Sequence, residues 1–222
     1  MYRKTIALIL LIAGLNSAAF ATPANLDDAI IDVAHRWAKV SYQTPEAERE
    51  AAFRSVINET QQVAQAFPGK AEPLIWQAIV LSSAAKAQGG LGALNKVKEA
   101  RDLLLTAEKI NPTALDGSVY NSLGSLYAKV PGWPIGFGDR KKAREYLEKA
   151  LAINPNGIDP NFFYAELLAD QGEYVRAVEY IKRALGAPPR PHREDADAGR
   201  RQDIQRLLES IRQKHGDQVA SK

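Results

Sequence analysis

The sequence predicts an all-α solenoid of about nine helices in antiparallel pairs, ended by a C-terminal capping helix. The main observation is a signature of two alanines, a larger apolar residue between them and a following proline, which recurs three times with the same internal spacing. Between the copies, apolar residues follow the 3.6-residue period of helices. The signature occurs at Ala100, Leu104, Ala107 and Pro112, at Ala143, Leu147, Ala150 and Pro155, and at Ala177, Ile181, Ala184 and Pro189.

This spacing places the three non-proline residues on one helical face, where small alanines let a neighbouring helix approach closely. The proline then ends the helix. One such unit cannot bury its apolar face alone, so repeated copies predict stacked units that share a continuous core. The pattern favours a binding scaffold, and it does not identify the partner.

Residues 1–21 have the features of a cleaved export signal. Arg3 and Lys4 precede an apolar run that ends in Ala19-Phe20-Ala21, a small–x–small site for signal peptidase. The run is shorter than the ~20 residues that span a bilayer. We therefore expect cleavage after Ala21, export, most plainly to the periplasm of a Gram-negative bacterium, and no membrane span in the mature chain.

The mature chain, residues 22–222, is long enough for one domain. Loss of Arg3 and Lys4 lowers the 29 basic residues to 27 against 26 acidic ones, a net charge of +1. Such a balance predicts no nucleic-acid partner. The chain has no cysteine, so disulfides and lipid-modified cysteines are excluded.

Residues 22–70 are predicted to form a divergent N-terminal helix pair. The first helix spans Leu26 to Tyr42, and Thr44 is a candidate N-cap for a second helix with Pro45 at its first position. That second helix contains a weakened copy of the signature, and the proline of this copy lies 44 residues before Pro112, which favours a divergent first repeat. The weakened copy is Val56, Thr60, Val63 and Pro68.

Residues 71–189 are predicted to hold three repeats, with long loops between the paired helices of the first two. Glu72-Pro73 opens the first repeat, and glycines 89, 90 and 92 end its first helix before a second helix from Lys96 to Ile110. In the next repeat an aromatic, Leu, Gly, Tyr pattern precedes the signature. That pattern is Tyr120, Leu123, Gly124 and Tyr127.

This pattern followed by the alanine signature resembles the tetratricopeptide repeat, and the third copy has that family's 34-residue length. The resemblance implies a right-handed solenoid that binds proteins or peptides in a concave groove lined by first-helix residues. Asn121 alone matches the lysines and asparagines of the family's two-carboxylate clamp, so that binding mode is not expected. Carried over by position, the groove lining would be Gln77, Leu81, Asn121, Ser125, Asp159, Phe162 and Glu166.

Residues 190–222 are predicted to be a short linker and the capping helix. Consecutive proline contexts disfavour helix around Arg190-Pro191-His192. Beyond the linker, apolar residues at i, i+3, i+4 and i+7 alternate with charged ones, the two-faced pattern that a terminal helix needs. The apolar set is Ile204, Leu207, Leu208 and Ile211.

The most distinctive segment is the loop at residues 130–139, which replaces a tight turn. Three glycines and two prolines exclude regular helix, yet Trp133, Ile135 and Phe137 are too apolar for a disordered linker. Two alternatives remain open: Trp133 and Phe137 cover an end of the core, or they form a lip for a ligand or partner. The segment at residues 89–94 is expected to meet this loop on one edge.

The sequence contains no catalytic or metal-binding motif, so we expect no enzyme activity, cofactor or metal site. Its three histidines, His35, His192 and His215, have no helical partner at metal-ligand spacing. The preferred function is an exported scaffold that binds a cell-envelope protein or peptide through the groove and the Trp133 loop, with oligomers allowed. The rival is a small-ligand carrier or enzyme with a pocket under that loop.

A narrower resemblance concerns the segment 159–164, Asp-Pro-Asn-Phe-Phe-Tyr, which opens a helix. Together with the signal and the small repeat array, it is similar to the periplasmic T-component proteins of TRAP transporters. That resemblance implies association with a substrate-binding protein, as an accessory of a solute transporter, and the capacity to self-associate. It assigns no role to individual residues.

Overall fold

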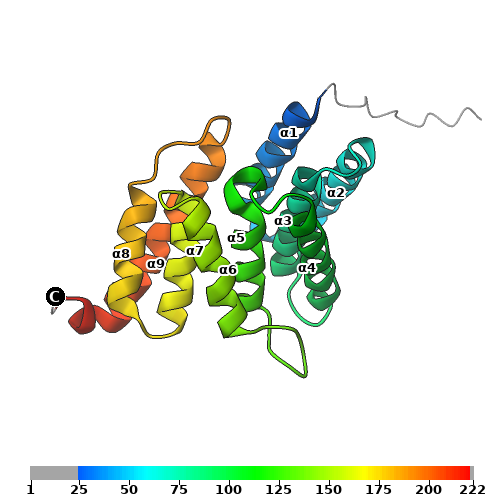
Figure 1. The fold of residues 1–222 in the computed structure, drawn as a ribbon. Coiled ribbons are helices and arrows are strands. Elements are labelled where there is room, and N and C mark those ends of the chain that lie inside the picture. Colours follow the sequence, from blue (N-terminus) through cyan, green and yellow to red (C-terminus); the bar gives the residue numbers. More distant parts are fainter. Residues whose placement is uncertain (1–24, 221–222) are drawn as a thin grey trace, which may run out of the picture.

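The computed structural model describes residues 25–220, and all regular secondary structure within that range is helical. The predicted export signal, residues 1–21, lies outside the described residues. The all-α solenoid predicted from the signature is confirmed (Figure 1). Its helices are α1 (Leu26–Ala38), a π-helical turn η1 (Lys39–Gln43), α2 (Glu46–Ala66), α3 (Ala71–Gln88), α4 (Ala93–Ile110), α5 (Ala114–Lys129), α6 (Arg140–Ile153), α7 (Ile158–Asp170), α8 (Tyr174–Leu185) and α9 (Glu194–Ala220).

The helices pack in successive antiparallel pairs, α3 with α4, α5 with α6 and α7 with α8. The signature residues are buried where these helices pack against one another. None of the nine alanine, leucine and isoleucine residues of the three copies is more than 1% exposed. Gly124 in α5 serves the same close approach: a Cβ there would lie 2.5 Å from Cγ of Leu147 in α6. The weakened first copy is also buried at Val56, Thr60 and Val63.

Two local predictions need correction near the N-terminus. The first helix changes to η1 after Ala38, and the N-cap of α2 is Pro45 rather than Thr44. The Thr44 hydroxyl donates instead to the carbonyl of Lys39 at 3.3 Å, which closes the π turn behind it. Likewise α4 begins at Ala93, so the first inter-helix connection is only the glycine-rich turn before it and not a long loop.

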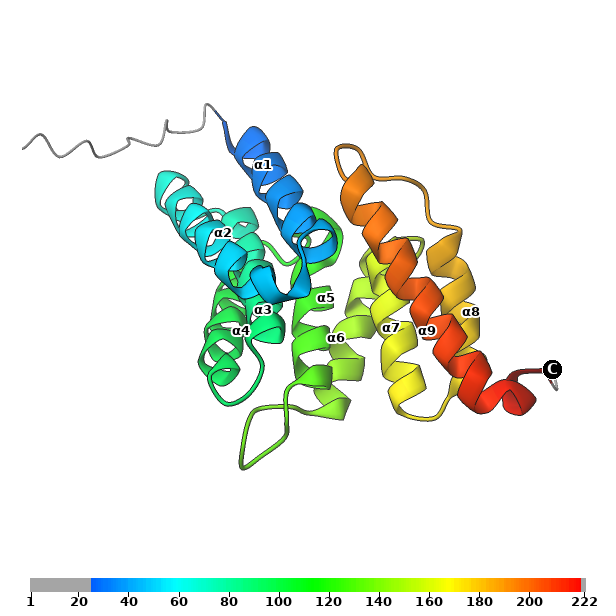
Figure 2. The same ribbon diagram turned by 180° about the vertical axis from the view of Figure 1, so that it is seen from behind.

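The C-terminal helix α9 covers the last repeat as expected of a cap. Ile204, Leu208 and Ile211 are buried, whereas Leu207 is only partly buried. The helix makes more contacts than the sequence indicated. Besides α7 and α8 of the last repeat, it contacts α1 and η1 at the other end of the array. Figure 2 shows α9 crossing the side of α7 and α8 toward α1. The two ends of the solenoid therefore meet.

No helix among the described residues is long and apolar enough to span a bilayer.

Candidate functional site

The loop at residues 130–139 is held at its base by backbone hydrogen bonds. The amide of Gly138 donates to the carbonyl of Pro131, and the amide of Asp139 donates to the carbonyl of Tyr127, both at 2.9 Å. The Asp139 carboxylate then accepts the amides of Lys141 and Lys142 at 2.9 and 3.1 Å, which caps α6. An ordered loop, as predicted, thus connects α5 to a capped helix.

Glycine is required where the two limbs of this loop approach each other. A Cβ on Gly138 would lie less than 3.0 Å from the carbonyl oxygen of Val130, and one on Gly136 would lie equally close to that of Pro131. Real Cβ atoms do not tolerate such distances from backbone, so any side chain would force the limbs apart. The narrow base therefore depends on these two glycines.

Phe137 anchors the loop to an aromatic row on α5 and α6. Its ring meets the ring of Tyr127 edge-on at 5.4 Å, and Tyr127 stacks on Tyr146 at 5.6 Å. The row continues from Tyr146 to Tyr120 at 6.0 Å. The guanidinium of Arg101 on α4 lies 4.6 Å from the centre of the Phe137 ring. These side chains fill the space beneath the loop and join it to the preceding repeat.

The tip of the loop points the opposite way, into solvent. Trp133 is 90% exposed and Ile135 is 57% exposed, so of the two sequence-based alternatives only Phe137 covers the core. Leu91, on the turn between α3 and α4, is 79% exposed, and that turn lies at the same edge of the solenoid as the loop (Figure 1). We call the exposed residues Leu91, Trp133 and Ile135 the Trp133 edge.

The predicted groove lining is largely inside the molecule. Four of its seven members, Gln77, Leu81, Asn121 and Phe162, are less than 9% exposed, and the other three, Ser125, Asp159 and Glu166, are partly buried. An open groove along the whole row of first helices is therefore not what the structure contains. The cause at its C-terminal end is α9, which the resemblance could not position.

Asp159 shows how α9 closes that end. Its carboxylate accepts from Arg190 in the linker at 2.6 Å and from Arg200 in α9 at 2.7 Å. The Arg200 guanidinium also lies 4.7 Å from the centre of the Phe162 ring. Burial by itself raises the pKa of Asp159, but the charges of Arg200 and Arg190 outweigh it and hold that pKa well below its usual range. Both groove residues thus have a structural partner.

A third arginine beside Arg190 and Arg200, Arg193, contacts α3 in the N-terminal half of the array. The guanidinium of Arg193 lies 4.9 Å from the centre of the Trp76 ring on α3. Burial, with a smaller effect of the Arg190 charge, lowers the pKa of Arg193 to about 10. None of these arginines was among the site residues predicted from the sequence. The sequence shows only that these arginines lie in or near the predicted linker. Their partner Asp159 is too distant in the sequence to be predicted from local spacing.

The inner face also contains polar groups outside this arginine cluster. Glu166 on α7 lies 3.6 Å from the ammonium of Lys129 on α5, which also pairs with Asp170 at 2.8 Å. Burial raises the pKa of Glu166, with the Lys129 charge acting against it. The side-chain oxygen of Asn121 is buried without a hydrogen-bond partner among the described residues.

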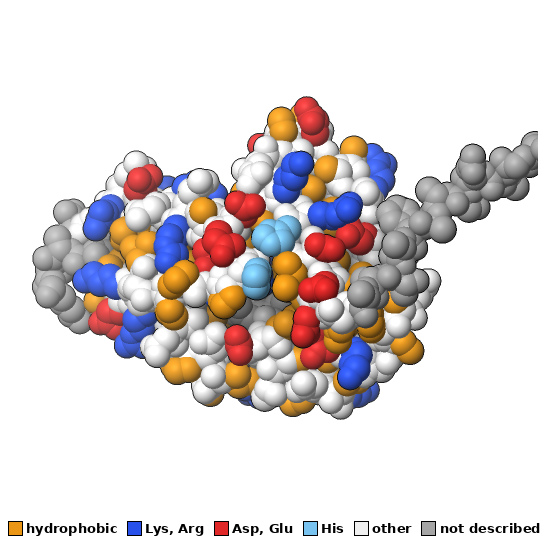
Figure 3. All heavy atoms as spheres, turned by 90° about the horizontal axis from the view of Figure 1, so that it is seen from above, with side chains coloured by type: hydrophobic (Ala, Val, Ile, Leu, Met, Phe, Trp, Pro, Cys, Tyr) orange, Lys and Arg blue, Asp and Glu red, His pale blue; other side chains and the backbone are white. Residues whose placement is uncertain are grey.

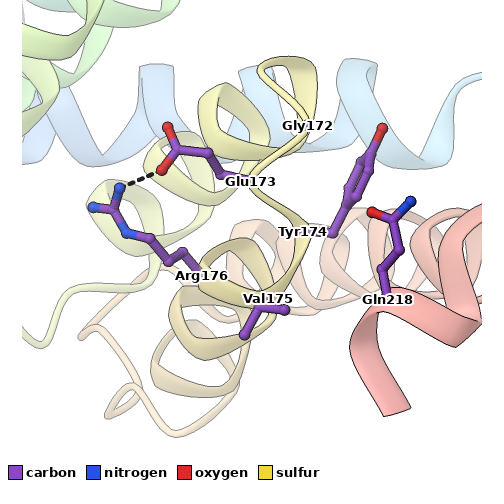
Figure 4. Close-up of a pocket in the computed structure, with 6 residues that line it drawn as sticks. All are labelled: Gly172, Glu173, Tyr174, Val175, Arg176 and Gln218. Carbon is purple, nitrogen blue, oxygen red and sulfur yellow. Dashed lines mark hydrogen bonds and ion pairs between the residues drawn. The ribbon is translucent and has the colours of Figure 1, made fainter. Parts of the chain in front are cut away.

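Two shallow hollows occur elsewhere on the surface, and neither lies under the Trp133 loop. The larger, of about 220 Å³, lies at the turn from α7 to α8 (Figure 4). Glu173 and Arg176 form an ion pair on one side of it, while Tyr174 and Gln218 line the other. The second, of about 160 Å³, is lined by Arg36, Ser55, Asn58, Glu59 and Gln62. Residues 25–220 contain no group of three or more side chains that could hold a metal ion.

Comparisons with known proteins agree with the helix-pair architecture. Residues 135–194 match the family model described as tetratricopeptide repeat. A Sol locus transcriptional repressor of Clostridium acetobutylicum is 37% identical over 68 residues, which are 31% of this chain and only 19% of that protein.

Three solved structures are similar to this chain over most of their own length. TTC0263, a thermophilic TPR protein of Thermus thermophilus, has a TM-score of 0.43 and 18% identity, with 83% of this chain and 99% of that one covered. MamA gives 0.33 and 21%, covering 68% and 95%, and pilF of Pseudomonas aeruginosa gives 0.33 and 16%, covering 86% and 94%. Residues 135–194 thus match the tetratricopeptide repeat, and the paired helices and buried signatures are consistent with that match.

Proposed function

We propose that the protein is an exported, periplasmic scaffold that binds a protein or peptide partner through the Trp133 edge. The observation that carries this proposal is a tryptophan that is 90% exposed at the tip of a loop whose base is fixed. Tryptophan is enriched among the residues that contribute most to protein interfaces. Because the loop is already ordered, little conformational entropy is lost when it docks.

The inner face is a second, smaller part of the proposal. Ser125 and Glu166 are partly exposed and are available to a partner that reaches past the Trp133 edge. Gln77, Asn121 and Phe162 are buried and are not available to a partner in this arrangement, and Arg200 of α9 lies over the Phe162 ring. We therefore propose that recognition begins at the edge and that any contact with the groove follows it.

Export is proposed from the signal-like segment alone. Cleavage after Ala21 predicts that the protein purified from cells begins at Thr22 and is released with the periplasmic fraction. N-terminal sequencing of the protein from fractionated cells tests this directly. A full-length chain in the cytosolic fraction would contradict it without affecting the proposal about the Trp133 edge.

The binding proposal is tested by capturing envelope proteins with Trp133→Ala and with a control, Arg54→Ala. Arg54 is exposed on α2 and distant in the repeat order from the loop. Both variants should fold normally, and the tryptophan variant alone should lose partners, by at least ~2 kcal/mol of binding free energy. If both variants retain the same partners at unchanged affinity, the edge is not the recognition surface.

A further inference from the structure

The exposed apolar side chains lie at opposite ends of the same helices. Five large apolar side chains are exposed in the described chain, and three of them form the Trp133 edge. The other two are Ile110, 43% exposed, and Ile153, 36% exposed. These are the last residues of α4 and α6, whereas Leu91 and Trp133 precede the first residues of the same two helices. At 1.5 Å per residue the 18 residues of α4 separate the two edges by about 27 Å.

Charge is polarised along the same direction. Segment 86–102, around Leu91, has four basic and two acidic residues, and segment 129–145, around Trp133, has five and two. Together these segments carry a net charge of +5, while residues 22–222 as a whole carry +1. Lys98, Arg140 and Lys141 are exposed here, and no ion pair within 4.0 Å engages them among the described residues. The Trp133 edge is therefore an apolar tip with a basic surround.

The opposite edge is acidic. Residues 25–32, which begin α1, have three acidic and no basic residues, and residues 108–117, next to Ile110, have two acidic and one basic. Figure 3 looks down on this edge and shows acidic side chains beside the histidines at its centre, with some basic side chains among them. Ile110 and Ile153 thus lie on an edge whose charge is opposite to that of the Trp133 edge.

We propose that the protein associates head to tail, with the Trp133 edge of one copy docked on the Ile110–Ile153 edge of a second copy. The inference rests on the proposed function, since it names a second copy as a partner of the same edge. Apolar tips then meet exposed isoleucines, and the basic surround meets an acidic one, which speeds and orients association. Because the two surfaces differ, the contact is heterologous and leaves a free edge at each end, so short open chains form.

A second copy of the chain explains more of the exposed apolar residues on the two edges than other binding partners do. A buried tryptophan contributes roughly 150–250 Å², whereas a specific interface needs about 800 Å² on each partner. The tip alone is too small, and the matching edge of another copy supplies both the missing apolar contacts and the opposite charge. An anionic membrane or an unrelated acidic protein would use the basic tip but leave Ile110 and Ile153 unexplained.

The test is sedimentation of the purified protein over a range of concentrations, with three variants. Trp133→Ala removes the tip, Ile110→Arg places a positive charge on the acidic edge, and Arg54→Glu is the control. The protein and the control should form concentration-dependent oligomers that weaken from low salt to about 1 M, where screening shortens to about 3 Å. Each edge variant should associate at least about 30-fold more weakly, which corresponds to about 2 kcal/mol at 1.4 kcal/mol per tenfold.

Mixing the two edge variants gives the sharpest result. Trp133→Ala retains an intact Ile110–Ile153 edge and Ile110→Arg retains an intact Trp133 edge, so together they should form a heterodimer and nothing longer. If the mixture remains monomeric, or if Ile110→Arg associates normally by itself, head-to-tail contact is wrong. Normal association of both variants would also overturn it.

Failure of this inference is distinguishable from failure of the proposed function. A protein that stays monomeric at every concentration, while Trp133→Ala still loses an envelope protein partner, overturns self-association and leaves the scaffold proposal standing. Binding of monomers to phosphatidylglycerol vesicles that requires Trp133 would assign the edge to lipid and overturn self-association. If Trp133→Ala changes neither self-association nor capture, both proposals fail.

Discussion

The ring of Tyr42 lies directly against the backbone of Gly199, so that η1 near the N-terminus and α9 near the C-terminus are in contact. A Cβ at position 199 would lie less than 3.0 Å from Cγ of the tyrosine ring. The Tyr42 hydroxyl also donates to the Asp203 carboxylate at 3.2 Å, one turn further along α9. This contact closes the inner side of the solenoid, and Gly199 is the residue that permits it.

Gly199→Ala is therefore expected to destabilise the protein although alanine is the better helix former. Inside a free helix the change would stabilise by roughly 1 kcal/mol, whereas overpacking against Tyr42 costs about 1–3 kcal/mol. Gly216→Ala is the matched control, because a Cβ there meets nothing within 4 Å. Urea denaturation should show a loss for position 199 and none for 216; equal effects would contradict the closed arrangement.

Enlarging a signature alanine should disrupt a close helix contact. Ala150 is 1% exposed, so Ala150→Leu should lower the free energy of unfolding by about 1–3 kcal/mol. Its neighbour Lys149 is not an inert control, because its ammonium lies about 5 Å from the rings of Tyr120 and Tyr146. Exposed Glu145 is better, and Glu145→Leu should change stability by no more than about 0.5 kcal/mol. Comparable losses in chemical denaturation would mean that the repeat register is wrong.

Asp159 should contribute stability that is lost only in acid. Its pKa in the folded protein is lowered, because Arg200 and Arg190 overcome the effect of burial. Such a carboxyl stabilises above its unfolded pKa of about 3.9, and the contribution disappears as the pH falls through the lower, folded value. Asp159→Asn leaves buried arginines uncompensated and should cost about 3–5 kcal/mol near neutral pH.

The measurement is urea denaturation of the protein and of Asp159→Asn from neutral pH downward. Their difference should be constant above about pH 5 and should shrink below it, because the unfolded chain binds a proton at Asp159 while the native carboxyl is still ionised. Exposed Asp195 supplies the control Asp195→Asn, which should differ from the protein by no more than about 0.5 kcal/mol. A difference that grows toward low pH has the wrong sign and would exclude the assigned role of Asp159.

Trp133 and Phe137 should have opposite effects on folding and binding. Trp133 is 90% exposed, so Trp133→Ala should change stability by no more than about 0.5 kcal/mol. Phe137 is partly buried against Tyr127 and Arg101, so Phe137→Ala should cost about 1–3 kcal/mol, less than the roughly 3–5 of a fully buried phenylalanine. Thermal unfolding compares the two, and a large loss for Trp133→Ala would refute the division into tip and base.

Much of the repeat structure could be predicted because it depends on short-range spacing. The positions of Ala100, Leu104 and Ala107 on one helical face follow from 3.6 residues per turn, and each proves to be buried. The candidate site could be predicted only in part. Composition marked the loop as ordered and apolar, but it could not separate exposed Trp133 from anchored Phe137, because both are large aromatics in the same irregular segment.

The sequence by itself determined the helix-pair repeats, their seam of small residues and the location of the unusual loop, since each of these depends on neighbours within one or two turns. Only the tertiary structure decided that the inner face is closed. Arg200 reaches Asp159 and Gly199 meets Tyr42 because α9 returns across the array. That path depends on the summed rotation of all the stacked helices, which no local spacing specifies.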